Sequence, residues 1–273
     1  MVLGGQLRRL RESRGISRPQ AGYTIRASES KISRLELGRV TFKERDVADL
    51  LTLYGVDDEH ERESFLDLVR QSNQPGWWHT YSDTLARWFQ DFIGLEESAS
   101  RVQTLETQFV PGLLQTEQYA RAVVRLCLPD ITPEQVERRV ALRRDRQRVL
   151  AMPRAPRVWA LIDEGVLYRS VADESVMRDQ WQHLLDLTRL PTVSVQIVPF
   201  SSGGGGAEGP FTLLRFAEPE LPDVAYLEHL SGALYLDKRS EVDLYAKVFH
   251  RLVTTAATPD ESRQLLAALV RKD

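Results

Sequence analysis

Apolar residues recur with a helical period through the N-terminal part of the chain. Leu3, Leu7 and Leu10 follow one another at intervals of four and three residues, so they share one face of a helix. Two further short helices are predicted over residues 18–24 and 29–37, each with apolar positions on one face and polar positions on the other. The pattern is that of small helices packed around one core.

Start and stop signals flank these two short helices. Ser17 and Ser28 stand at their N-cap positions, and Pro19 lies in the first turn of the earlier helix. Gly38 stands just past the end of the later helix, where a residue in the left-handed conformation often terminates a helix. The region therefore predicts a helix, a tight turn and a second helix.

The helical pattern continues beyond Gly38. One further apolar stripe consists of Val47, Leu50, Leu51 and Tyr54. Another helix is predicted over residues 58–71, and the sequence Asn-Gln-Pro-Gly then interrupts the pattern. Four or five short helices predict a compact all-α domain over residues 1–72.

The remaining residues, 73–273, show a mixed pattern. Strands are predicted over residues 101–109, 157–163, 192–199, 211–216, 224–228 and 233–236. Helices are predicted over residues 82–92, 116–126, 133–151, 175–189, 240–256 and 259–271. Because helices and strands come in groups, an α+β domain with a mixed or antiparallel sheet is expected, with the last three strands forming an antiparallel meander.

The net charge of −3 conceals an asymmetry between the two predicted domains. Residues 1–45 carry eleven Lys or Arg and four Glu, a net charge of +7, and the rest of the chain carries −10. A basic head on an acidic body suggests that only the head meets a polyanion. A chance cluster of solvated arginines is the alternative, but the cluster coincides with the helix-turn-helix pattern.

Cysteine content and hydropathy bear on the compartment. The single cysteine, Cys127, excludes an internal disulfide and is expected to be a small buried apolar residue in a reducing cytoplasm. No apolar run approaches the ~18 residues that a membrane span needs. We therefore expect a cytoplasmic protein with no membrane association.

The predicted helix at residues 29–37 has an outer face that suits DNA. Ala21, Ile25, Ile32 and Leu35 can face one core, which leaves a polar and basic face on the other side. The residues on that face are Glu29, Ser30, Lys31, Ser33 and Arg34. A short polar helix held rigidly by a partner helix is what reading a DNA major groove requires.

At this point the N-terminal residues resemble a known family. Residues 6–11 (Gln-Leu-Arg-Arg-Leu-Arg), residues 15–17 (Gly-Ile-Ser) and residues 28–38 match the XRE-type helix-turn-helix family, which is related to phage repressors and Cro. Two positions depart from the family pattern. Gly22 replaces the usual alanine at the close approach of the two helices, and Arg26 replaces the usual turn glycine, where a left-handed backbone would be mildly strained.

This resemblance implies roles for individual residues. Base contacts are implied for Glu29, Ser30, Lys31 and Arg34. Phosphate contacts, which position the protein without specifying sequence, are implied for Arg18, Ser28, Arg39 and Lys43. A structural salt bridge between the first helix and the recognition helix is implied for Arg11 and Glu36.

The body of the chain also resembles a known domain. The sequences at residues 76–79 (Gly-Trp-Trp-His), 109–116, 209–214 and 226–235 look like the C-terminal domain of unknown function that follows an XRE head in many actinobacterial regulators. Those proteins include the WhiJ-like developmental regulators and are described as antitoxin-like. The resemblance implies a cytoplasmic regulator with a small partner protein, often encoded by an adjacent gene.

Residues of the body that carry chemistry favour binding over catalysis. The five histidines are scattered without metal-ligand spacing, so no metal or other cofactor is expected, and no nucleophile motif is visible, so no enzyme is expected. Glycines at 203–206 and 209 favour a loop between strands over a phosphate-binding loop. Trp77, Trp78 and Tyr81 favour packing over a stacking platform for bases.

Two further groups in the body are candidate surfaces for a ligand or partner. Glu228 and His229 follow one another at a strand end, where a hydrogen-bonded structural pair is favoured over acid-base work. Residues 134–150 hold six arginines and only three acids. A solvated face with helical ion pairs is one interpretation, and a dock for an acidic partner or DNA phosphates through Arg138, Arg139, Arg143 and Arg144 is the other.

Three functional hypotheses follow from the sequence. The first is a sequence-specific DNA-binding transcriptional regulator that binds double-stranded DNA as a homodimer and reads a pseudo-palindromic operator. The second is an antitoxin-like protein that binds a small partner and uses DNA binding for autoregulation. The third is a small-molecule sensor built on the α+β body.

Overall fold

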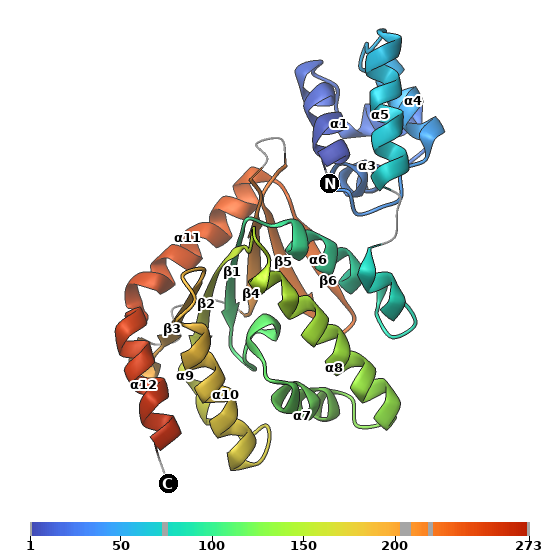
Figure 1. Ribbon diagram of the computed structural model, residues 1–273. Coiled ribbons are helices and arrows are strands. Elements are labelled where there is room, and N and C mark those ends of the chain that lie inside the picture. The colour runs from blue at the N-terminus through green and yellow to red at the C-terminus, as the bar shows by residue number, and fades with distance from the viewer. Residues whose placement is uncertain (1, 73–75, 203–208, 218–220, 272–273) are drawn as a thin grey trace. The chain divides into compact units, whose positions relative to one another are not determined.

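A computed structural model describes residues 2–72, 76–202, 209–217 and 221–271. The chain divides into two compact units, one of residues 1–79 with 216–222 and one of residues 80–215 with 223–273. The first unit is helical and the second is α+β (Figure 1). Both fold classes expected from the sequence are thereby confirmed, and the domain limits of 1–72 and 73–273 stay a prediction.

Five α-helices form the N-terminal unit. They are α1 (Val2–Ser13), α2 (Arg18–Thr24), α3 (Glu29–Glu36), α4 (Glu44–Leu53) and α5 (Glu59–Ser72). A short 3-10 helix follows over Trp77–Tyr81. Helices α2, α3 and α5 lie within one residue of their predicted ranges, and the stripe of Leu3, Leu7 and Leu10 lies in α1 as expected. These helices are amphipathic and have local termination signals.

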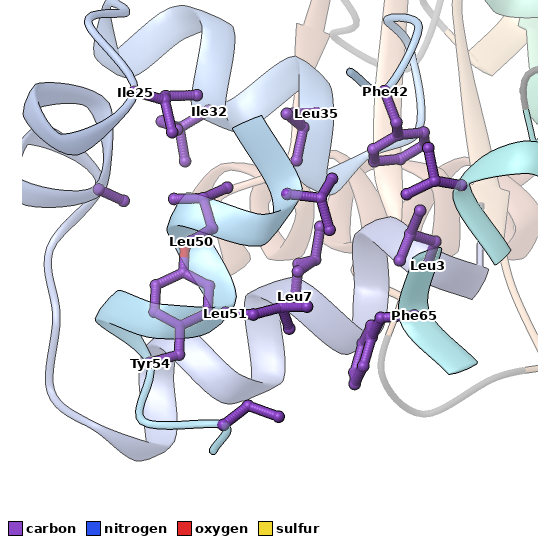
Figure 2. Close-up of a cluster of buried hydrophobic side chains, with 14 residues drawn as sticks. Leu3, Leu7, Ile25, Ile32, Leu35, Phe42, Leu50, Leu51, Tyr54 and Phe65 are labelled. Atoms are coloured by element: carbon purple, nitrogen blue, oxygen red, sulfur yellow. The ribbon is translucent and has the colours of Figure 1, made fainter. Parts of the chain in front are cut away.

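The core of this unit joins residues from all five helices (Figure 2). Leu7 from α1, Ile32 from α3 and Leu50 from α4 are fully buried, and Phe65 from α5 packs at the edge of the same cluster. Because no single short helix is stable alone, this shared burial is what fixes the orientation of α3.

Two glycines permit backbone geometry that another residue would oppose. A Cβ atom on Gly4 of α1 would lie 2.4 Å from the carbonyl oxygen of Glu36, so glycine here lets α1 approach the end of α3. Gly38 has a φ of +66° just beyond α3, which confirms the predicted stop. Both glycines therefore constrain where α3 lies and ends.

A six-stranded mixed sheet organises the C-terminal unit. Its strands are β1 (Arg101–Glu106), β2 (Arg157–Asp163), β3 (Val193–Val198), β4 (Phe211–Arg215), β5 (Val224–His229) and β6 (Gly232–Leu236). The strand order is β3-β2-β1-β4-β5-β6. Strands β1, β2 and β3 are parallel, whereas β4, β5 and β6 run antiparallel as the predicted meander.

Helices cover both faces of this sheet. The helices of the unit are α6 (Arg87–Ser98), α7 (Glu117–Cys127), α8 (Pro133–Gln147), α9 (Glu164–Tyr168), α10 (Glu174–Leu187), α11 (Arg239–Thr255) and α12 (Pro259–Arg271). Residues Phe249 and Leu252 of α11 share a buried cluster with Leu105, Leu161 and Leu213 of the strands. On the other face Phe92 of α6 stacks on Tyr226 with ring centroids 4.2 Å apart, and α8 crosses the same side of the sheet (Figure 1).

Three sequence-based expectations in this unit are corrected. The helix predicted over residues 82–92 is α6 at 87–98, because its buried stripe is centred on residues 92–96. The short helix α9 was not expected; Asp163 caps it by accepting a hydrogen bond from the Gly165 amide at 2.8 Å. Cys127, expected to be buried, is exposed because α7 ends there, beyond its packing partners.

The glycine-rich loop lies only partly within the described residues. Residues 203–208, which hold four of its five glycines, are outside them, and Gly209 lies just before β4. No helix in the part of the chain that the structure describes is both long and apolar enough to cross a membrane.

Candidate nucleic-acid interface

Local capping builds the predicted recognition helix, α3. The Ser28 hydroxyl accepts a hydrogen bond from the Lys31 amide at 3.2 Å, which satisfies an amide that the helix itself leaves unpaired. Ile32, Leu35 and Glu36 are buried on the inner face. A rigid helix with one buried face therefore presents its other face outward.

Three of the four residues expected to contact bases lie on that outer face. Glu29, Ser30 and Arg34 are exposed, and the Arg34 Nε donates a weak hydrogen bond to the Ser30 carbonyl oxygen at 3.3 Å. That bond stays within the helix and leaves the rest of the guanidinium group available for the fork geometry that suits a guanine edge.

Lys31 differs from these three residues. Its ammonium group lies 2.8 Å from the Asp46 carboxylate of α4, and the side chain is half-buried. The lysine that was expected near the bases therefore has a partner within the helical unit, and contact with DNA would have to replace that partner.

A buried charge network holds α1, α2 and α3 together. The Glu36 carboxylate accepts hydrogen bonds from Arg11, with Arg11 Nη2 3.1 Å from Oε2, and from the Nε of Arg18 at 3.0 Å. The Glu36 side chain is 1% exposed. The implied pair Arg11 and Glu36 is thus in contact, and Arg18 joins it.

The environment of this network changes the ionisation of its members. Burial alone would lower the pKa of Arg11, but the hydrogen bond and negative charge of Glu36 outweigh it and raise that pKa. Burial and the charge of Glu36 also raise the pKa of the nearby Tyr54. Arg11 therefore stays charged and Tyr54 stays neutral beside the buried Glu36 carboxylate.

The residues implied as phosphate contacts fall into two groups. Arg18 and Ser28 each already make internal hydrogen bonds, to Glu36 and to the Lys31 amide. Lys43 is exposed just before α4, and Arg39 is half-buried just after α3. Lys43 is therefore the simplest of the four to reach a phosphate without disturbing the fold.

The turn between α2 and α3 has the geometry expected from its departures from the family pattern. Arg26 has a φ of +53°, which confirms the predicted left-handed backbone at a residue that is not glycine. A Cβ on Gly22 would lie 2.6 Å from the Ala27 carbonyl oxygen, so the second departure sits at a close backbone approach.

Tyr23 is a candidate contact that the sequence reasoning missed. Its side chain, in the last turn of α2, is 88% exposed. The signal was present in the sequence, because Tyr23 lies between the inward-facing Ala21 and Ile25. An aromatic ring with a hydroxyl group at such a position can contact a sugar-phosphate backbone.

The C-terminal candidate residues do not form one surface. Arg138 and Arg144 lie on the outer side of α8 and form exposed ion pairs with Asp83 and Glu117. A second set of α8 arginines, Arg139 and Arg143, is half-buried.

The β5 candidates are separate again. Glu228 accepts a hydrogen bond from the Tyr226 hydroxyl at 2.8 Å, and His229 is exposed at the strand end. Among the described residues no three His, Cys, Asp or Glu side chains are grouped as a metal ion would need.

Comparison with known proteins gives two matches. Residues 2–65 match the family model described as "Helix-turn-helix domain". Residues 89–268 match the model described as "Domain of unknown function (DUF5753)". No curated protein and no solved structure matches the chain.

Proposed function

Because the chain belongs to the family of the Domain of unknown function (DUF5753) and carries an N-terminal helix-turn-helix domain, we propose that it is a sequence-specific DNA-binding transcriptional regulator. The helix-turn-helix domain indicates DNA binding, and one observation carries the finer proposal. Glu29, Ser30 and Arg34 are exposed together on a helix whose opposite face is buried in a charge-locked core.

Base reading in this proposal rests on Arg34 and Glu29. The Arg34 guanidinium donates two hydrogen bonds to a guanine edge, and the Glu29 carboxylate accepts one from a cytosine amino group. Ser30 adds a hydroxyl that can donate or accept. Lys31 contributes only when its contact with Asp46 is exchanged for one with DNA.

Phosphate contacts set the position of α3 in the groove. Lys43 and Arg39 supply positive charge beside α3, and Ser28 and Arg18 add to it from positions where they also support the fold. The net charge of +7 over residues 1–45 draws the helical unit to DNA and makes binding depend on salt.

Two half-sites fit the proposal better than one. A single short helix reads only a few base pairs, so a homodimer on a pseudo-palindromic operator is the arrangement that gives useful specificity. Resemblance to XRE-type and WhiJ-like regulators supports an actinobacterial, cytoplasmic regulator whose C-terminal domain modulates DNA binding and has no catalytic activity of its own.

The decisive experiment selects operators from random DNA with the full chain and then compares two variants on the selected site. Arg34→Ala is expected to lose about 1–3 kcal/mol on the selected site and to relax the preference at one base pair. Lys43→Ala is the matched control. It should weaken binding to all sequences alike and reduce the salt slope by about one. Uniform loss for Arg34→Ala would contradict base reading by that residue.

An antitoxin-like partner-binding role is the second candidate function. It is favoured by an open groove of about 620 Å³ beside α8, lined by Tyr81, Pro133, Glu134, Glu137, Arg138 and Ala141. A small protein encoded by an adjacent gene is the expected occupant. Co-purification that is lost in Ala141→Arg, with DNA selection unchanged, supports this role; partner binding that is unaffected by Ala141→Arg contradicts the groove as its site.

A further inference from the structure

The six arginines of the α8 region separate by the side of the helix that they occupy. On the outer side Arg138 lies 2.8 Å from Asp83, and Arg148 lies 2.9 Å from Asp145. In both ion pairs the arginine is exposed to solvent, as expected for a solvated helix face with ion pairs. They explain the outer arginines without any ligand.

The inner side carries Arg139, Arg143 and Arg146, which the spacing of four and three residues places on one face of α8. Arg146 has both an ion-pair partner and an aromatic contact within the domain. Its Nε and Nη2 donate to the two oxygens of Glu96 on α6 at 3.0 and 2.9 Å, and its guanidinium lies 5.0 Å from the centre of the Phe89 ring. A buried arginine whose charge is paired with a carboxylate through two hydrogen bonds has a structural role.

Arg139 and Arg143 have no comparable partner. Within the described part of the chain, no carboxylate lies within 4.0 Å of either guanidinium. The Nε of Arg139 is buried without a hydrogen-bond acceptor, and the Nη1 of Arg143 reaches only the Arg139 carbonyl oxygen, at 3.5 Å. Two half-buried cations thus lie side by side, and within the described residues neither has a carboxylate at ion-pair distance.

The sheet face opposite carries polar side chains in two neighbouring rows. Thr104, Thr212 and Tyr226 pair across β1, β4 and β5, and the hydroxyls of Thr104 and Thr212 lie 3.1 Å apart. Glu106 and Glu228 lie two residues farther along β1 and β5 on the same face. The hydrogen bond from the Tyr226 hydroxyl to Glu228 shows that these two side chains lie on the same face of β5.

Aromatic contacts connect the two sides. The guanidinium of Arg146 lies 5.5 Å from the centre of the Phe92 ring, and that ring stacks on Tyr226 of β5. The inner face of α8 is therefore directed toward the part of the sheet that carries Glu228.

The ionisation of the facing groups agrees with this placement. Burial, together with the like charges of Arg146 and Arg139, lowers the pKa of Arg143 to about 10, and Glu228 acts against that shift. Burial, with the like charge of Glu228, raises the pKa of Glu106 to about 8. Near neutral pH a protonated Glu106 can donate a hydrogen bond, whereas Arg143 remains a cation.

We propose that Arg139 and Arg143 bind the oxyanion of a small organic molecule between α8 and the sheet, with Glu106 and Glu228 hydrogen-bonded to a hydroxyl group on the same molecule. The oxyanion supplies a negative charge in direct contact with both arginines and an acceptor for the buried Nε of Arg139. Carboxylate and phosphate share this chemistry, so the ligand is a hydroxylated acid or a phosphate ester.

Calorimetric titration of the full chain tests the site, with inorganic phosphate and 3-hydroxybutyrate as probes. Saturable binding of at least one probe is expected, tenfold or more weaker in Arg143→Gln. Arg144→Gln, on the outer side of the same helix, is the matched control and should stay within twofold of the unaltered protein. Phosphate alone or 3-hydroxybutyrate alone identifies the preferred oxyanion. Absence of saturable binding for both probes, or equal weakening in the two variants, overturns the proposal.

A second measurement needs no ligand. An arginine that is retained for ligand binding destabilises the ligand-free protein. Arg143→Met is therefore expected to raise the melting temperature by about 2–4 °C. Arg146→Met should lower it, because Glu96 would remain buried without a partner. A fall for both variants would assign Arg143 a structural role and overturn the proposal. No DNA is present in either assay, so failure here leaves the proposed DNA reading intact.

Discussion

Charge away from solvent is arranged in opposite ways around the buried Glu36 in the N-terminal unit and around the half-buried Arg143 in the C-terminal unit. Glu36 is 1% exposed and is bracketed by Arg11 and Arg18 from two other helices. Arg143 lies beside two further arginines on the same face of α8 and has no carboxylate within ion-pair distance in the described residues. Glu36 therefore connects three helices through its ion pairs, whereas the charge of Arg143 is what the proposed oxyanion would neutralise.

This difference matches the division of labour proposed for the two units. The N-terminal unit has to hold α3 rigidly, because base reading tolerates little movement of the helix. The C-terminal unit keeps a charge imbalance that a ligand can relieve, and such relief is a way to favour one state of the domain over another.

The largest expected effect comes from breaking the paired network. Glu36→Ala would leave Arg11 and Arg18 buried without their shared carboxylate and should destabilise the helical unit by about 3–5 kcal/mol. Chemical denaturation followed by circular dichroism measures this change. Glu29→Ala, on the exposed face of the same helix, should change stability by no more than about 0.5 kcal/mol. Similar losses for both would show that the network does not fix the fold.

The next largest effect concerns Glu106 and tests the charge imbalance in the C-terminal unit. Its pKa is raised to about 8, so the folded state binds a proton that the unfolded state releases above about pH 4.5. Stability should therefore fall as pH rises toward 8, by about 1–3 kcal/mol between pH 6 and pH 9 given partial contact with solvent.

Glu106→Gln should remove most of that pH dependence, since the amide is neutral throughout. Urea denaturation at pH 6 and pH 9 measures it, with the exposed Glu134→Gln on α8 as the matched control. A pH slope that survives Glu106→Gln would assign the effect to other groups.

A smaller effect is expected at Lys31. Because its ammonium group already contacts Asp46, Lys31→Ala should cost only about 0–1 kcal/mol of affinity for the selected operator. Fluorescence anisotropy on that operator compares it with Arg34→Ala. A loss at Lys31 equal to or larger than that at Arg34 would mean that the lysine exchanges Asp46 for DNA.

The smallest effect lies in the turn before α3. Glycine relieves the left-handed backbone at position 26, so Arg26→Gly should stabilise the helical unit by about 0.5–1 kcal/mol. Thermal denaturation measures the gain. Arg45→Gly, at an exposed position in α4, should instead lose about 1 kcal/mol. Destabilisation of Arg26→Gly would show that the arginine side chain supports the turn.

Much of the fold could be predicted because its signals are local. Ser17 and Ser28 cap α2 and α3 as expected. Each hydroxyl accepts a hydrogen bond from a backbone amide three residues later, so the cap needs no distant partner. The range of β2 was predicted without error from its apolar run. The start of α6 was misplaced and α9 was missed, because short or weakly capped segments depend on what they pack against.

The candidate sites were predictable only in part. Spacing along α3 placed Glu29, Ser30 and Arg34 on one outer face, and the structure has them there. The same reasoning grouped Arg138, Arg139, Arg143 and Arg144 as one surface, whereas they lie on two sides of α8. Which side of a helix is buried is decided by its neighbours, and a run of arginines carries no local mark of it.

The sequence by itself determined the helix-turn-helix pattern, the basic head and the α+β body, because periodicity, capping and net charge are properties of neighbouring residues. Tertiary structure alone decided that Lys31 contacts Asp46, that Arg18 joins Glu36, and that the half-buried Glu106 and Arg143 each lie near a like charge. These outcomes depend on residues far apart in the chain, and electrostatic interactions depend on distance and burial, which no sequence interval specifies.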